Sequence, residues 1–111
     1  MTRRPASAAA RRAAEPAPVA WERRHRPGPG FAFRREAFGG ILFHFEGRRP
    51  DPRVSIVDSP FLVQLLELVE QAPLGELLDQ AAAQFGLDPA QERTLRAFFT
   101  ALVERGALVP A

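Results

Sequence analysis

The stretch that decides the fold is FAFRREAFGGILFHFEGRRPDPRVSIVDSP, residues 31–60. Apolar and polar residues alternate in three short runs within it. A period of two, with aromatic and β-branched residues, is typical of half-buried strands. Glycine and proline separate the runs, and we assign Gly39 and Gly40 to the first connection. The pattern predicts a three-stranded antiparallel meander with one aromatic face, formed by Phe31, Phe33, Ile41, Phe43 and Phe45; His44 would lie on the opposite face, as a surface residue.

After residue 58 the apolar period changes to that of helices. Serine followed by proline is a typical helix start, because serine caps the free amides and proline lacks one. The segment Asp88-Pro89-Ala90-Gln91 has the form of a capping box. Pro73, Gly86 and Gly106 are typical helix ends. We therefore expect three helices, the first starting at Ser59 and ending before Pro73, the second starting near Leu74 and the third near Asp88.

The order of elements is thus three strands followed by three helices. Neither the sheet nor any single helix can bury its apolar side alone, so the helices must cover the sheet. The sequence predicts an α+β domain over residues 19–111, winged-helix-like with the sheet at its front. Residues 1–18 are rich in Ala, Arg and Pro, and we expect them to form a disordered tail.

Composition excludes several classes of protein. The chain has no cysteine, which excludes disulfides and thiolate metal sites, and no apolar run approaches the roughly 20 residues needed to span a bilayer. Residues 1–53 carry twelve Arg against five acidic residues, a net charge of +7, whereas residues 54–111 carry three against eight, a net of −5. The split indicates either an acidic partner for the N-terminal half or merely solvated surface charge.

No catalytic or metal-binding pattern is found. The three serines lie outside any nucleophile motif, and His25 and His44 have no companion at ligand spacing. Glu67 and Glu70 are one helical turn apart, but a solvated helix edge explains them better than a catalytic pair. We therefore expect a protein that is not an enzyme and holds no cofactor or metal of its own.

The strand over Arg53–Val57 is an edge strand in a simple meander, and it contains no proline. An open edge can accept an extended peptide as a further strand. The third helix would form the wall of such a groove, with Arg93, Arg96 and Thr100 along one flank and Phe99 and Val103 beside them. Alternatively, the tail or a second copy covers the edge, Phe99 and Val103 are buried, and the arginines are merely solvated.

These residues resemble a known family, the mycofactocin-system precursor-peptide chaperones, which are PqqD-like RiPP recognition elements. The resemblance covers roughly residues 21–110 and omits the tail. It rests on Arg34-x-Glu36-x-Phe38-Gly39-Gly40, the aromatic strand through Phe45, the Arg48-Arg49 turn, Val54–Val57, Ser59-Pro60 and the ending Leu102-x-x-x-Gly106-x-Leu108-Val109.

The resemblance implies three strands followed by three helices, and a groove between the third strand and third helix that binds the leader of a short precursor peptide. It also implies a radical S-adenosylmethionine maturase as partner, which would supply the iron–sulfur cluster and modify the end of the peptide. We expect a cytoplasmic protein without membrane contact. The leader-facing positions would be Arg53, Val54, Ser55, Ile56, Val57, Arg93, Arg96, Phe99, Thr100 and Val103.

Two other functions fit part of the pattern. In a winged-helix DNA-binding protein, Arg93 and Arg96 would enter the groove and the Arg48-Arg49 turn would be the wing. The acidic C-terminal half counts against this, because a DNA reader gathers positive charge on one face. A dimerisation module, whose open strand pairs with its own copy, would form a two-fold dimer without affinity for a peptide.

Overall fold

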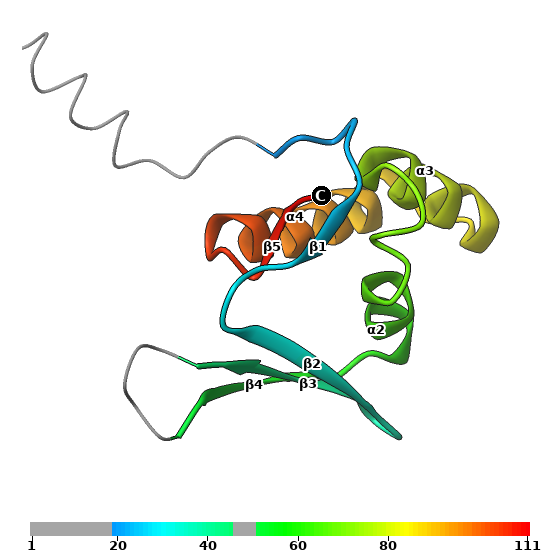
Figure 1. Cartoon of the computed structure of the whole chain (residues 1–111). Coiled ribbons are helices and arrows are strands. Elements are labelled where there is room, and N and C mark those ends of the chain that lie inside the picture. Colours follow the sequence, from blue (N-terminus) through cyan, green and yellow to red (C-terminus); the bar gives the residue numbers. More distant parts are fainter. Residues whose placement is uncertain (1–18, 46–50) are drawn as a thin grey trace, which may run out of the picture.

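The computed structural model describes residues 19–45 and 51–111 (Figure 1). The predicted tail and the Arg48-Arg49 turn lie outside the described residues. The elements, in chain order, are β1 (His25–Pro27), β2 (Phe31–Glu36), β3 (Gly39–His44), β4 (Arg53–Val57), α2 (Pro60–Leu66), α3 (Leu74–Phe85), α4 (Pro89–Glu104) and β5 (Leu108–Pro110).

The main sheet has the strand order β2-β3-β4, with both pairs antiparallel. In Figure 1 the helices lie on one side of this sheet. The predicted α+β architecture, an antiparallel three-stranded sheet followed by three helices, is therefore confirmed.

The glycine pair differs from its predicted place. Gly39 pairs with Glu36, so Ala37 and Phe38 alone form the first connection and the glycines begin β3. A Cβ on Gly39, whose φ is 147°, would lie 2.1 Å from the carbonyl oxygen of Val57. Glycine is needed there because the start of β3 passes directly against the end of β4.

The aromatic residues divide between the two faces of the sheet. Phe33 pairs with Leu42, and both contribute to the core, whereas Ala32 pairs with Phe43. Because paired residues share a face and successive residues alternate, Phe43 lies on the outer face, away from the helices. The prediction of a single aromatic face was therefore wrong: Phe31 and Phe33 lie inside, while Ile41, Phe43 and Phe45 lie outside.

The two-residue hairpin sets this register, and the sequence alone did not reveal its length. His44 consequently lies on the inner face, half-buried and stacked on Phe31 with 4.0 Å between ring centroids. The expectation that His44 is a surface residue on the opposite face is therefore corrected, because its side chain is half-buried on the inner face.

The helix ends follow the predicted chemistry. Ser59 Oγ accepts from the amide of Leu62 at 3.2 Å, although α2 ends at Leu66 rather than near Pro73. Asp88 and Gln91 form a complete capping box at the start of α4, and Gly86 ends α3 in the left-handed conformation at φ 62°. The core lies between the helices and the inner face of the sheet, and comprises Leu42, Leu65, Leu66, Val69, Leu74, Leu77, Leu78, Ala81, Leu95, Phe99, Leu102, Ala107 and Leu108.

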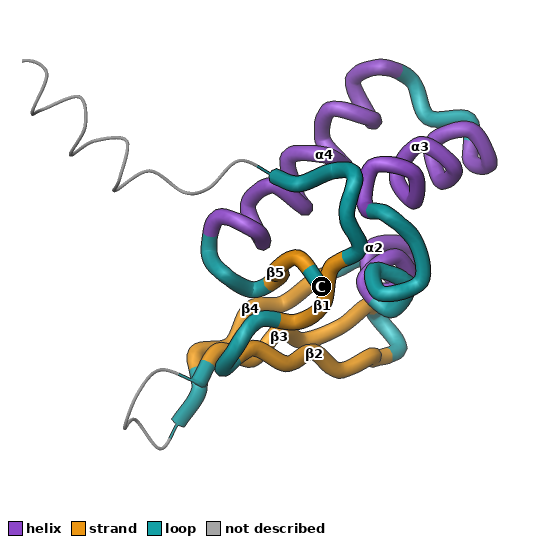
Figure 2. The backbone as a smooth tube through the Cα atoms, turned by 45° about the horizontal axis from the view of Figure 1, so that its top comes forward, coloured by secondary structure: helices purple, strands orange, loops and turns teal. Residues whose placement is uncertain are grey.

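A second, two-stranded sheet joins the two ends of the described domain. β1 pairs antiparallel with β5, with Arg26 opposite Val109, and Figure 2 shows this ribbon between α4 and the main sheet. The sequence predicted only a short extension after Gly106. In the described residues, no helix has the length and apolar character needed to cross a membrane.

Candidate functional site

The main sheet has two edge strands, β2 and β4. β3 pairs with one side of β4, and no strand of the described chain pairs with its other side. The Phe45 amide donates to the Gly30 carbonyl at 2.7 Å and continues the β2–β3 ladder. This bond fixes the phase of the alternating hydrogen bonds, so the amides of Ser55 and Val57 point toward β3.

The backbone amides of Val54 and Ile56 therefore point outward from the sheet edge. Their side chains project from the outer face and are 55% and 61% exposed. Two inward-facing side chains of β4 are more covered, since Ser55 is half-buried and Val57 is 7% exposed. β4 thus offers outward backbone donors and acceptors beside an exposed apolar surface.

An open cleft lies just past the end of β4. Its volume is about 390 Å³, and Ser59, at its rim, is two residues beyond Val57. The carboxylate at the rim, Asp88, already accepts from the Gln91 amide at 2.8 Å. The cleft separates the start of α2 from the first half of α4, and it is lined by Ser59, Phe61, Leu62, Leu87, Asp88, Ala90, Gln91, Thr94 and Leu95.

The flank of α4 that was predicted to form the wall of the peptide groove contacts α3 and Trp21 instead. Arg96 forms an ion pair with Asp79 of α3 at 2.5 Å, and its guanidinium carbon lies 4.8 Å from the ring centroid of Trp21. Because side chains three, four and seven residues apart share a flank, Arg93, Thr100 and Val103 lie along the same side.

Thr94 lies about 200° around the helix from Arg96. The flank of Arg93, Arg96, Thr100 and Val103 is therefore turned toward α3 and Trp21, away from the cleft that Thr94 lines. Phe99 is 0% exposed, so its side chain belongs to the core and cannot contact a ligand in this arrangement. Of the helix residues predicted to face a peptide, Phe99 is buried and the other four lie on the flank turned from the cleft, whereas the strand residues lie at a sheet edge. Their part in binding a peptide stays a prediction.

Sequence reasoning missed the flank that does face the cleft. Gln91 and Thr94 line the cleft, and Phe98 follows on the same side of the helix at spacings of three and four residues, which was a visible signal. Phe98 is half-buried and meets Phe99 edge to face, with 5.2 Å between centroids. Periodicity shows that these residues share a flank of α4, but it does not reveal which neighbour that flank contacts. The arginines led the prediction to the other flank.

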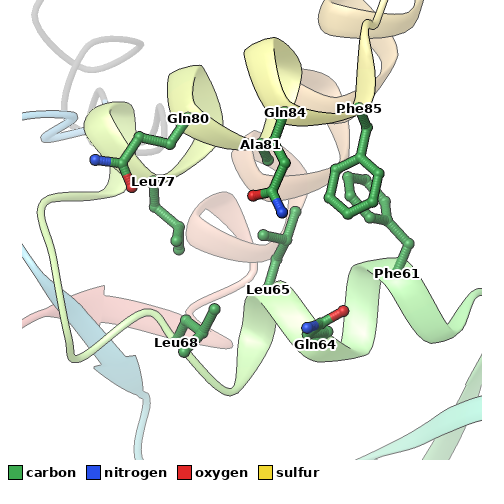
Figure 3. Close-up of a pocket in the computed structure, with 9 residues that line it drawn as sticks. All are labelled: Phe61, Gln64, Leu65, Leu68, Leu77, Gln80, Ala81, Gln84 and Phe85. Atoms are coloured by element: carbon green, nitrogen blue, oxygen red, sulfur yellow. The ribbon is translucent and has the colours of Figure 1, made fainter.

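A second, smaller cleft lies between α2 and α3 (Figure 3). Its volume is about 120 Å³, and Gln64, Gln80 and Gln84 line it together with apolar residues. Phe61 and Phe85 face each other across one end, with centroids 5.0 Å apart and planes at 78°. None of the described residues that line this cleft is charged.

The titratable groups form no catalytic arrangement in the parts of the chain that the structure describes. An exposed ion pair joins Arg35 to Glu67, and its hydrogen bonds lower the pKa of Glu67 and raise that of Arg35. Burial lowers the pKa of His25. Among the described residues, no three His, Asp or Glu side chains are grouped to hold a metal ion.

One of three comparisons with known proteins identifies a family. Neither the search of curated proteins nor the search of solved structures found a match. The model of the peptide chaperone MftB family, however, matches residues 24–109, which span every strand and helix of the described domain apart from the last residue of β5. The chain belongs to the peptide chaperone MftB family.

Proposed function

We propose that this chaperone binds the leader of a ribosomally made precursor peptide as a fourth strand on β4, and delivers it to a radical S-adenosylmethionine maturase in mycofactocin biosynthesis. The observation that carries the proposal is the edge position of β4, where the backbone amides of Val54 and Ile56 point away from β3. The family of peptide chaperones supports the peptide as the class of ligand.

Pairing along this edge supplies affinity with little demand on sequence. Five residues of strand offer roughly 17 Å of backbone contact, and the outward amides of Val54 and Ile56 are the donors. Leader side chains would alternate between the helix side and the outer face of the sheet. Specificity therefore depends on the pockets that receive them.

The cleft beyond Val57 is the pocket that best fits this arrangement. A leader strand that continues past the end of β4 reaches Ser59, where Leu62 and Leu95 offer apolar walls. An apolar leader side chain would bury there at roughly 25 cal/mol per Å² of surface removed from water. Such contacts must offset the roughly 2–5 kcal/mol that it costs to order a disordered leader.

The chaperone contributes no bond chemistry in this proposal. The cluster and the cosubstrate belong to the maturase, and the chaperone raises the local concentration of the peptide's reactive end. Such a role requires no cofactor in this chain and places it in the cytoplasm with the maturase. Arg96 is committed to Asp79 and Trp21, which weakens the alternative of a DNA-reading helix.

The direct experiment is a calorimetric titration with the leader of the precursor encoded beside this chain's gene, together with hydrogen exchange. We expect saturable one-to-one binding, and new protection at the amides of Val54 and Ile56. The amides of Ser55 and Val57 should be protected already without peptide, because they pair with β3. Absence of binding, or protection confined to another element, would refute the proposal.

A further inference from the structure

The outer face of the main sheet carries a group of apolar side chains that no described helix covers. We name this group the outer patch: Ile41, Phe43, Phe45, Val54 and Ile56. Figure 1 shows the helices on the other side of the sheet. Phe45, Val54 and Ile56 are 50%, 55% and 61% exposed. Single exposed apolar residues are common, but a contiguous group marks an interaction surface.

The outer patch is ordered by its own contacts. Phe43 and Phe45 stack with their centroids 6.5 Å apart, and the Arg34 guanidinium lies 5.6 Å above the Phe43 ring. Arg34 also donates to Glu36 at 2.8 Å. The two charged side chains that β2 places on this face, Arg34 and Glu36, therefore neutralise each other. The Arg34-x-Glu36 pattern is explained as a pair two residues apart on one face of a strand.

This neutrality restricts the class of partner. Nucleic acids and anionic lipid surfaces are bound through lysine and arginine charges that reach phosphates. The part of the outer face that the structure describes offers apolar rings and β-branched side chains instead, and Arg34 is held by Glu36. An apolar protein surface is the complementary partner.

The position of the patch favours a protein that acts on the bound peptide. Val54 and Ile56 belong to the same strand whose edge is the proposed peptide site, so a leader paired with β4 would add its alternate side chains to this face. A protein seated there would lie within a few ångströms of the peptide. We propose that the outer patch is the surface on which the maturase docks; this inference rests on the proposed function.

Docking on the outer patch would leave the cleft and the edge of β4 free for the leader. The maturase would then bind a composite surface, formed partly by the chaperone and partly by the outward side chains of the bound leader. Its affinity for the chaperone should therefore increase when the leader is present. This arrangement explains how one small sheet serves two partners at once.

The test is to replace Phe45 by Asp and to measure two affinities separately, for the leader peptide and for the maturase encoded with it. The matched control is Phe85→Asp, because Phe85 has a similar exposure, 56%, but lies on α3. We expect F45D to weaken maturase binding by about tenfold or more, and leader binding by less than about twofold. F85D should leave both affinities unchanged.

The outcomes separate the inference from the function on which it rests. Equal maturase affinity for F45D and the wild type would overturn the docking surface but leave leader capture intact. Loss of leader affinity in F45D would show that the patch belongs to the peptide site, which also overturns it. If F45D instead converts a dimer to a monomer with maturase affinity unchanged, the occupant is a second copy. A wild-type chain without leader affinity would refute the proposed function itself.

The substitution Ile41→Thr, on β3 within the outer patch, guards against misfolding. Threonine keeps the β-branched shape that suits a strand, while its hydroxyl makes the surface more polar. With the circular dichroism spectrum unchanged, this variant should also lose maturase affinity and retain leader affinity. Retained affinity for both would overturn the inference independently of F45D.

Discussion

The guanidinium carbon of Arg96 lies 4.8 Å from the centroid of the Trp21 ring, and the same guanidinium donates to Asp79 at 2.5 Å. Three parts of the chain meet there: the segment before β1, α3 and α4. The contact explains why this flank of α4 turns away from the cleft, and it gives Arg96 a structural role.

Replacing Arg96 by Glu should therefore affect stability rather than peptide binding. The change removes the ring contact and places two carboxylates together, which should cost about 1 kcal/mol, because partly exposed pairs contribute little more. Urea denaturation measures this cost, with Arg93→Glu on the same flank as control. Leader affinity should stay within about twofold of the wild type. A stable R96E variant with lost leader affinity would show that this flank does face the peptide.

Proline substitutions in β4 distinguish the edge that pairs with β3 from the edge proposed to bind the leader. Ile56→Pro removes an outward amide and leaves the β3 ladder intact, so the fold should tolerate it, as edge strands tolerate proline. Leader affinity should decrease about tenfold, because a backbone hydrogen bond is lost and the ring hinders pairing.

Ser55→Pro is the matched comparison one residue away. It removes the amide that points toward β3 and should destabilise the fold by about 3 kcal/mol. Calorimetry and thermal unfolding together separate the two effects. An I56P variant that binds the leader as tightly as the wild type would place the guest strand elsewhere.

The sequence predicted where helices and strands begin and end better than it predicted which face of each strand is buried. Capping at Ser59 and Asp88 and the glycine at Gly86 are local chemistry, and the structure confirms the helix starts and ends that depend on them, apart from the early end of α2. Which face of β3 is buried depends instead on a hairpin of two residues. Moving Gly39 from the turn into the strand changes the partner of Phe43 and thus its side of the sheet.

The candidate site was predicted only in part. An edge strand can be read from strand order, and Arg53–Val57 is the edge strand that was predicted, while its binding of a peptide stays a proposal. The neighbours of a helix flank depend on how the helix is rotated in the fold, which local patterns do not encode. The contact of Trp21 with Arg96, across 75 residues, and the pairing of β1 with β5 are long-range relationships of this kind.

Filling the cleft tests the pocket proposed for the leader. Thr94 is exposed at the cleft wall, and a phenylalanine there would occupy part of the 390 Å³. Thr94→Phe should weaken leader binding about tenfold without unfolding the domain. Arg93→Phe, the adjacent exposed position on the other flank, is the control and should bind normally. Equal affinities for both variants would remove the cleft from the binding site.

The pH dependence of stability should reflect His25. Its side chain is 0% exposed, its Nδ1 lies 3.0 Å from the Arg23 carbonyl, and its Nε2 has no hydrogen-bond partner among the described residues. Burial lowers the pKa of His25 below its ordinary value of 6.5, while the bond to the Arg23 carbonyl partly opposes this shift.

The unfolded chain therefore takes up a proton at a higher pH than the folded chain does. The contribution of His25 to the free energy of unfolding is largest above pH 6.5 and decreases as the pH falls from 6.5 toward the lowered pKa. His25→Asn retains a donor for the Arg23 carbonyl but cannot titrate, so its unfolding free energy should depend less on pH in this window, even if its stability is lower throughout. Urea unfolding at several pH values on both sides of 6.5 compares the two slopes. Because β1 joins β5 at this residue, identical slopes would mean that the β1–β5 ribbon opens enough to hydrate the ring in the folded state.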